Sequence, residues 1–306
     1  MPDEEQFPVL DVSDWEIIAD ETVGAEEKYW LQEPGTTRRW LFKSVTVKQG
    51  HIHGEDWAEK AVAQLAGLLG IPCARIELAE MRGAPGCIGA DLRPPLHELQ
   101  HGQVLLEERG APGYIHGKGK VHPGHSLENI QAALQGMLPP PGCEPDFGAT
   151  AFDVFAGYLL LDAWVANRDR HDNNWAVLRP VMASGEPLCL CGSYDHASSL
   201  GFNLTDQRSA RLVEQQRVTA WCENGTAWRF EHDPGRPVPT LVEMAARALR
   251  LSSPKARQYW PARLREVEHD EVLHVLARVP RMSDPARTFA EKVFEVNRRR
   301  VLDACT

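Results

Sequence analysis

The stretch AWVANRDRHDNNWAVL, residues 163–178, decides how the rest of the sequence is interpreted. It overlaps the end of the apolar segment 151–167, which has helical periodicity, and it closes with residues 175–178, which have the composition of a strand. The polar residues 167–174 between them are therefore expected to form a helix-to-strand loop. Most polar loops are solvated turns, but loops held by rigid elements are also where catalytic groups concentrate.

A second carboxylate follows the next predicted strand. Residues 188–191 (LCLC) have the composition of a strand and lead into Gly192-Ser193-Tyr194-Asp195-His196. This order places Asp195 at the end of a strand, as a second candidate beside the polar loop.

A lysine lies far upstream in an apolar environment. Lys43 follows Trp40-Leu41-Phe42 within a predicted strand, where a lone lysine is costly unless an opposite charge pairs with it. The next predicted helix offers two partners, Glu55 and Glu59. On a helical wheel Glu55 lies nearer the apolar face, so the residues themselves leave the choice open.

These residues have the types that phosphoryl transfer from ATP requires. A lysine neutralises charge on the nucleotide phosphates, aspartate and asparagine oxygens hold Mg²⁺, and a loop carboxylate accepts the proton of the attacking hydroxyl. The loop supplies Asp169 and, five residues later, Asn174. The pattern therefore favours an ATP-dependent phosphotransferase.

Four segments resemble the HipA-like serine/threonine kinases, bacterial relatives of protein kinases and phosphoinositide kinases. The similarity runs over roughly residues 28–200, and its most specific element is the order D-R-H-x-x-N, the reverse of the H-R-D order of ordinary protein kinases. The matching segments are RRWLFK (38–43), GEDWAEKAVAQLAGLLGIP (54–72), AWVANRDRHDNNWAVL (163–178) and SYDHASSLG (193–201).

The resemblance implies a role for each candidate residue. Asp169 is the expected catalytic base, and Asn174 and Asp195 are the expected metal ligands. Lys43 is the expected phosphate-binding lysine, and the family register favours Glu59 as its helix partner. ATP and Mg²⁺ are the implied cofactors, and a serine or threonine hydroxyl of a protein or peptide is the implied acceptor.

His171 is expected to support the loop, with its ring bonded to the loop backbone so that Asp169 is held in place. Phosphoinositide kinases also carry D-R-H-x-x-N, so a lipid or a small molecule is the alternative acceptor. The Tyr194-Asp195 pair favours the HipA-like group, because lipid kinases have Asp-Phe-Gly at that point.

Two features of the HipA toxins are not recognised in the sequence. These toxins carry an additional small N-terminal subdomain and a serine-containing phosphate loop, whereas the turn here is Glu33-Pro34-Gly35-Thr36. A nucleotide-binding pseudokinase scaffold is therefore a non-enzymatic alternative. The rival enzyme class is a metal-dependent phosphohydrolase, suggested by the His-Asp pairs at 171–172, 232–233 and 269–270.

The predicted elements give an α+β, bilobal, protein-kinase-like fold. Residues 1–95 are expected to form a small N-lobe, with strands near 15–19, 28–32, 39–47, 74–79 and 86–92 and a helix over 55–69. Residues 96–306 are expected to form a larger, mainly helical C-lobe, with helices over 151–167, 241–251 and 285–304.

Composition excludes several other classes. The 306 residues carry a formal net charge of −10, so a nucleic-acid partner is not expected. The longest apolar run, 154–161, is shorter than the ~18–20 residues that a membrane span needs. The acidic start MPDEEQFP and seven scattered cysteines favour a cytoplasmic protein without disulfides.

The segment Gly113–His125 is rich in glycine, histidine and lysine in an otherwise acidic chain. In a bilobal kinase it would begin soon after the connection between the lobes and lie beside the cleft. Lys118 and Lys120 would then attract an acidic acceptor. The alternative is an exposed hairpin with solvated charges.

Overall fold

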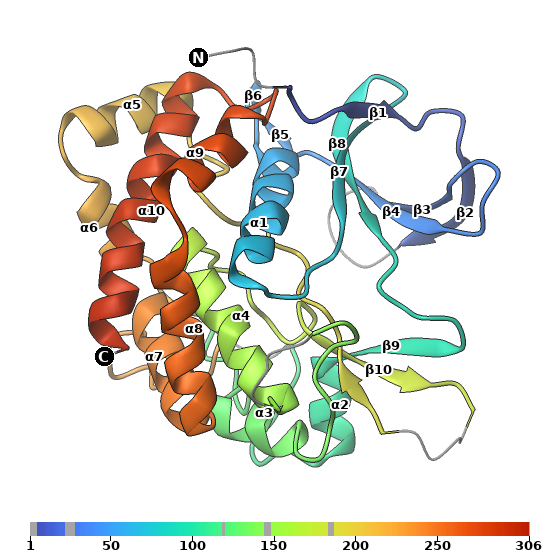
Figure 1. The fold of residues 1–306 in the computed structure, drawn as a ribbon, viewed down its shortest axis with the longest axis vertical. Helices are drawn as coiled ribbons and strands as arrows, with labels where there is room; N and C mark the ends of the chain where they lie inside the picture. The colour runs from blue at the N-terminus through green and yellow to red at the C-terminus, as the bar shows by residue number, and fades with distance from the viewer. Residues whose placement is uncertain (1–4, 22–27, 118–119, 144–147, 183–186, 306) are drawn as a thin grey trace.

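The computed structural model describes residues 5–21, 28–117, 120–143, 148–182 and 187–305. Figure 1 shows a strand-rich lobe, a helical lobe below and beside it, and one long connection between them. This arrangement is the expected α+β, bilobal fold.

The strand-rich lobe is built on a six-stranded sheet in the order β1-β7-β8-β4-β3-β2. β1 pairs with β7 in parallel, and the other neighbours are antiparallel. Side chains alternate between the two faces of a strand. Trp40 and Phe42 therefore enter a small apolar core, while Lys43 lies on the opposite face. The strands are β1 (Val9–Asp11), β2 (Glu16–Glu21), β3 (Lys28–Gln32), β4 (Arg39–Ser44), β7 (Ile76–Met81) and β8 (Ala84–Ala90).

Helix α1 (Glu55–Leu69) packs against β7 and β8 and has the bounds that the sequence predicts. Its apolar positions recur at helical spacing, and most of them are buried. The helix ends at Gly70, whose φ of 71° is a left-handed conformation that glycine adopts without strain. Arg281 contacts its first turn from the other lobe, with Nη1 lying 2.9 Å from Oδ2 of the buried Asp56.

The connection 91–96 leads into a three-stranded sheet in the order β11-β10-β9 and then into the helical lobe. Helix α4 (Ala151–Val165) runs through the centre of that lobe, and all of its residues are buried. The strands are β9 (His97–His101), β10 (Ala176–Pro180) and β11 (Cys189–Leu190).

Two features fix α4 in place. Its N-terminus carries a capping box between Thr150 and Asp153, which satisfies free backbone N–H groups. A Cβ atom at Gly157 would lie 2.6 Å from the ring of Trp260, so only glycine allows this close packing. The other helices are α2 (Gly102–Glu108), α3 (Leu127–Ala133), α5 (Asp206–Glu214), α6 (Val218–Glu223), α7 (Leu241–Leu251), α8 (Pro254–Glu266), α9 (His269–Ala277) and α10 (Asp284–Ala304).

Some predicted bounds are wrong. The predicted strand 39–47 ends at Ser44, and a separate hairpin follows, formed by β5 (Val47–Lys48) and β6 (His51–Ile52). The predicted helix 151–167 ends at Val165, because Ala166 adopts a left-handed φ of 57°. These errors fall at element ends, where local turn geometry overrides periodicity.

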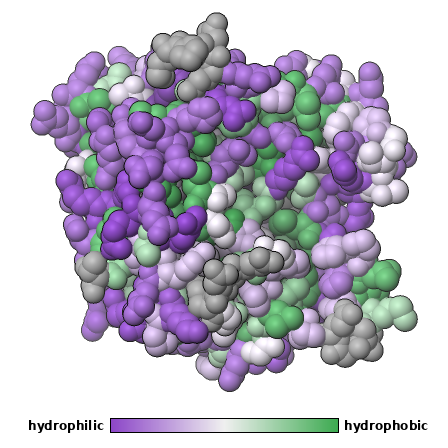
Figure 2. Space-filling view, viewed as in Figure 1, coloured by the Kyte–Doolittle hydropathy of each residue, from purple (hydrophilic) through white to green (hydrophobic). Residues whose placement is uncertain are grey.

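The face shown in Figure 2 is mainly hydrophilic. Exposed large apolar side chains include Leu96, Val181 and Met182 near the ends of β9 and β10. Within the described ranges, no helix combines the length and the apolar character needed to cross a bilayer.

Candidate active site

The polar loop predicted from the sequence joins the end of α4 to the start of β10. Two contacts shape it: Asp169 donates its backbone N–H to Oδ1 of Asn167, and Asn174 donates its side-chain amide to the carbonyl of Asp169 at 2.8 Å. The His171 ring accepts a hydrogen bond at Nδ1 from the backbone N–H of Asn173, 3.1 Å away. Burial lowers the pKa of His171, so the ring is neutral near pH 7.

A buried ion pair anchors this loop to α4. The guanidinium of Arg170 binds the two carboxylate oxygens of Asp162 at 2.8 Å each, and both side chains are only 2% exposed. Arg170 also donates to the carbonyls of Asn174 and Tyr194 and to the hydroxyl of Ser193. One arginine therefore connects the loop with the segment that carries Asp195.

Lys43 holds two carboxylates. Its Nζ atom lies 2.7 Å from Oδ1 of Asp195 and 3.3 Å from Oε1 of Glu59. Burial by itself would lower the pKa of Lys43, but the two carboxylates raise it above its usual value. Burial would raise the pKa of Asp195, but the charge of Lys43 holds it below its usual range. Lys43 and Asp195 are therefore both ionised at neutral pH.

Of the two glutamates that the sequence leaves open, Glu59 contacts Lys43. Its other oxygen accepts the backbone N–H of His196 at 2.9 Å. Burial raises the pKa of Glu59, and the charge of Lys43 opposes this shift. Glu55 accepts the backbone N–H of Thr46 at 2.6 Å instead.

We expect the Lys43→Ala and Glu59→Ala variants each to lose most ATP turnover, and the double variant to lose little more, because paired residues act as one unit. The matched control replaces Glu55 with alanine, alone and with Lys43→Ala, and its effect should be independent of Lys43. Initial rates of ATP turnover measure both cycles. Additive losses for Lys43 and Glu59 would contradict the pairing.

Between the lobes lies a cleft of about 470 Å³, lined by Lys43, Glu59, Asn174 and Asp195. Lys28 lies directly opposite Lys43 on the neighbouring strand and lines the same cleft. Two like charges side by side are unfavourable unless anions offset them, and Asp195 and Glu59 supply part of that offset here. The cleft lining also includes the apolar residues Trp30, Leu41, Ile76, Ala90, Leu92 and Leu99.

Asp169 does not line the cleft itself but lies beside His171, which does, and contacts an arginine. Oδ1 of Asp169 lies 2.6 Å from Nε of Arg229, and both side chains are a little more than a quarter exposed, at 29% and 28%. Oδ2 has a more distant neighbour, Nε2 of His171 at 3.9 Å. One carboxylate oxygen of Asp169 therefore remains accessible.

The glycine-rich segment lies against the polar loop. The hydroxyl of Tyr114 donates to Asp172, and His116 lies 3.1 Å from the same oxygen. The segment and the loop enclose a second pocket of about 200 Å³, and His171 and Asn173 line both this pocket and the cleft. Lys120 is exposed, and Lys118 lies outside the described residues.

Sequence reasoning missed three site residues. Asp162 could have been found from the sequence, because it is a charged residue within the apolar segment that forms α4. Lys28 had a weaker one, since it begins the strand before Lys43. Arg229 had none: it lies sixty residues downstream of Asp169, and only the tertiary fold brings the two together.

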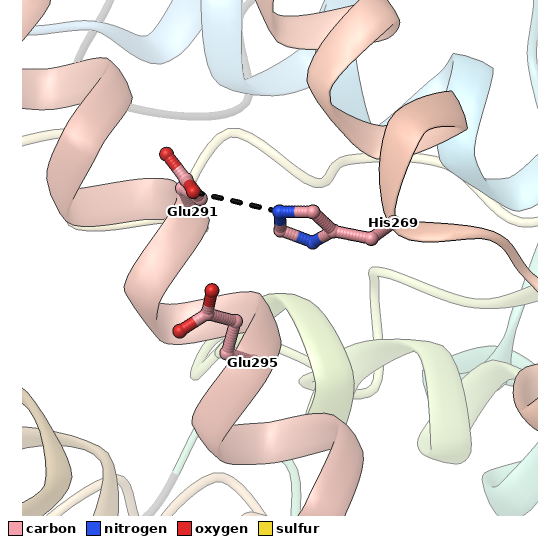
Figure 3. A group of neighbouring side chains, drawn as sticks. All are labelled: His269, Glu291 and Glu295. Atoms are coloured by element: carbon pink, nitrogen blue, oxygen red, sulfur yellow. Dashed lines mark ion pairs between the residues drawn. The ribbon is translucent and has the colours of Figure 1, made fainter.

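The structure also bears on the phosphohydrolase alternative. The metal-like group found among the described residues is His269, Glu291 and Glu295 on α9 and α10, with ligand atoms within 4.8 Å of one another (Figure 3). His269 faces Glu291 at 3.5 Å, and Glu295 also pairs with Lys292. None of these residues lines the cleft, and the group lacks Asp270 of the predicted His-Asp pair.

A strand-rich lobe with one helix, a helical lobe, and a cleft between them that contains a Lys–Glu ion pair define a protein-kinase-like fold. The structure is similar to the Helicobacter pylori proinflammatory kinase CtkA, with a TM-score of 0.73 and 15% identity over 97% of both chains. This likeness confirms the expected fold, and at that identity it concerns the fold alone.

Two further solved structures align with lower scores. HipA of the Shewanella oneidensis MR-1 toxin–antitoxin system has a TM-score of 0.47 and 13% identity, over 98% of this chain and 67% of HipA. The Mycobacterium tuberculosis PknI kinase domain has a TM-score of 0.34 and 13% identity, over 87% of this chain and 99% of PknI. The sequence matches no protein-family model and no curated protein.

Proposed function

We propose that this chain is an ATP- and Mg²⁺-dependent phosphotransferase of HipA-like type that phosphorylates serine or threonine hydroxyls of a protein or peptide. One observation carries the proposal: Lys43 binds the carboxylates of Asp195 and Glu59 in a cleft bordered by the loop of Asp169 and Asn174. These are the groups that phosphoryl transfer requires.

The cleft fits a nucleotide in size and in polarity. Ligand sites usually enclose about 300–1,000 Å³, and this cleft encloses about 470 Å³. The apolar residues in its lining suit a purine base. Its lining also includes Lys28 and Lys43, and an anionic polyphosphate would add to the offset of their adjacent charges that Asp195 and Glu59 supply.

Asn174 and Asp195 fit a magnesium ion in their chemistry. Asn174 uses its NH₂ group on the Asp169 carbonyl, so its amide oxygen is left for a cation. Asp195 adds a carboxylate oxygen, and such oxygen donors are the ligands that Mg²⁺ prefers. When bound, the ion would neutralise charge on the phosphates.

In the proposed reaction the acceptor hydroxyl oxygen bonds to the γ-phosphorus of ATP. The bond from that phosphorus to the bridging oxygen breaks, and ADP leaves with the electron pair. Oδ2 of Asp169 receives the hydroxyl proton, because Oδ1 is engaged by Arg229. Lys43 holds the phosphates, and Glu59 holds Lys43.

The acceptor would approach through the second pocket, between the glycine-rich segment and the loop. Its volume of about 200 Å³ suits a serine or threonine side chain with part of its peptide. Cytoplasm remains the proposed compartment, because all seven cysteines are free thiols, as a reducing environment favours.

Mass spectrometry of the protein after incubation with Mg-ATP tests the proposed chemistry. Phosphoserine or phosphothreonine on the chain itself, absent when EDTA replaces Mg²⁺, would establish transferase chemistry without knowledge of the natural acceptor. ATP consumption with phosphate released only into water would favour the phosphohydrolase alternative instead.

We expect the Asn174→Ala and Asp195→Ala variants to lose the magnesium dependence of ATP binding. In the wild type Mg²⁺ should strengthen ATP binding about 10- to 100-fold, the effect of a charge-assisted contact of about 1.5–3 kcal/mol. Calorimetric titration with Mg²⁺ and with EDTA measures this ratio. Asp172→Asn is the control, because Asp172 faces Tyr114 and does not line the cleft. A ratio unchanged in both alanine variants would refute the metal role.

A further inference from the structure

The most unexpected contact at the candidate site is the ion pair between Asp169 and Arg229. Arg229 lies in the segment between α6 and α7, far from the loop in sequence. Ion pairs that remain in contact with solvent usually contribute little to stability, about 0–1 kcal/mol when fully exposed, so stability alone gives little reason for an arginine at this point.

The guanidinium is held in one orientation. It stacks on the ring of Trp228, with Cζ lying 3.8 Å from the ring centroid. The carbonyl of Arg229 accepts a hydrogen bond at 2.7 Å from Nδ1 of the buried His125. Trp175, at the end of the loop, donates its indole N–H to Nε2 of the same ring.

This chain of contacts ties Arg229 to the loop that it faces. Because the Trp175 indole can only donate, Nε2 of His125 carries no proton and Nδ1 is the donor. Burial lowers the pKa of His125 to about 4, which keeps the ring neutral and fixes this tautomer at neutral pH. Arg229 is thus held at two points: its backbone carbonyl is bonded to His125, and its guanidinium stacks on the ring of Trp228.

Arg229 has N–H donors that are not used within the part of the protein that the structure describes. Its Nε–H is used on Asp169, and the structure gives its two Nη groups no hydrogen-bond acceptor among the described residues. These groups are also not among the buried unpaired atoms of the described chain, so they reach solvent. Arg229 lines the second pocket, which shares two lining residues, His171 and Asn173, with the cleft.

We propose that Arg229 is a catalytic residue that contacts oxygens of the γ-phosphoryl group through its Nη atoms while its Nε holds Asp169. This inference rests on the proposed function. A phosphoryl group that moves toward the acceptor approaches the negative charge of Asp169, and a fixed guanidinium offsets that repulsion. Arg229 keeps all of its protons, and the hydroxyl proton goes to Oδ2 of Asp169.

The test compares binding of Mg-ADP alone with binding of Mg-ADP plus aluminium fluoride, which imitates the phosphoryl group in transfer. A group that acts on the transition state strengthens the second complex and not the first. In the wild type we expect aluminium fluoride to tighten ADP binding. Arg229→Ala should reduce this gain about 10- to 100-fold and change ADP binding itself by less than about twofold.

Two further variants sharpen the test. Arg229→Lys should keep part of the gain, because it keeps the charge but loses the paired donors. Arg236→Ala is the matched control: Arg236 lies in the same segment, is 82% exposed and pairs only with Asp233 among the described residues, so the full gain should remain. Added ethylguanidinium should also restore phosphoryl transfer to Arg229→Ala, which a merely structural arginine would not allow.

The outcomes separate this inference from the proposed function. A wild type that gains affinity from aluminium fluoride, with an Arg229→Ala variant that gains as much, would overturn the inference alone. A wild type that binds neither Mg-ATP nor Mg-ADP would overturn the proposed function and the inference with it.

Discussion

The Asp169→Asn variant should lose phosphoryl transfer by about 10² to 10⁴ in kcat, the usual contribution of a general base. Asparagine has nearly the same shape but cannot accept the hydroxyl proton. Mg-ATP affinity should change by less than about twofold, because Asp169 does not line the nucleotide cleft. Transfer rates and ATP titrations on the same preparation measure the two effects.

The control for this variant is Asp233→Asn. Asp233 is an exposed carboxylate that pairs with Arg236 and does not contact the polar loop, so transfer should stay near the wild-type rate. Undiminished transfer by Asp169→Asn would remove Asp169 from the role of base. A parallel loss of ATP binding would mean that the substitution disturbs the cleft instead.

Arg170→Met should lower the free energy of unfolding by about 3–5 kcal/mol, because it leaves the carboxylate of Asp162 buried without a partner. Urea unfolding measures this loss. The double variant Asp162→Leu/Arg170→Met should regain part of it, since no buried charge is then left unpaired. The carbonyls of Asn174 and Tyr194 would still lack their donor, so transfer should stay low in the double variant.

Arg168→Met is the matched control for this prediction. Arg168 lies two positions earlier in the same loop, is exposed, and reaches the hydroxyl of Thr226 only at 3.5 Å. Its replacement should change the free energy of unfolding by less than about 0.5 kcal/mol. Equal losses for both arginines would show that the Asp162 pair does not anchor the loop.

Local sequence signals predicted the fold well where they are strong. The apolar spacing of residues 55–69, closed by Gly70, gave α1 with its observed bounds, and Thr240 with Glu243 gave the start of α7. Short helices such as α2 and α6 were not predicted. They are too short for a clear period and depend on tertiary packing.

The candidate site was predictable to the extent that its residues lie in one motif. Asp169 and Asn174 belong to one loop, and the resemblance connected them with Lys43, Glu59 and Asp195. The residues alone could not decide between Glu55 and Glu59, because a helical wheel does not show which strand the helix faces. Packing of α1 on β7 and β8 turns Glu59 toward Lys43.

Contacts between segments that are distant in the sequence could not be predicted from it. Arg229 is an ordinary arginine in a loop until the fold brings it to Asp169. Lys28 can be recognised as a candidate site residue only once the strand register, which places it opposite Lys43, is known. Such pairings depend on long-range geometry, which periodicity and capping signals do not report.

The measurement that tests the central claim most directly follows the γ-phosphate of ATP. The protein is incubated with peptide acceptors, Mg²⁺ and ATP that carries radioactive phosphorus at the γ position, with α-labelled ATP as the control. We predict that the γ label, and not the α label, appears on serine or threonine of the protein or the peptides, and that Asp169→Asn abolishes this transfer. Label that appears only in inorganic phosphate, or that reaches hydroxyl groups equally in Asp169→Asn, would contradict the proposed phosphotransferase.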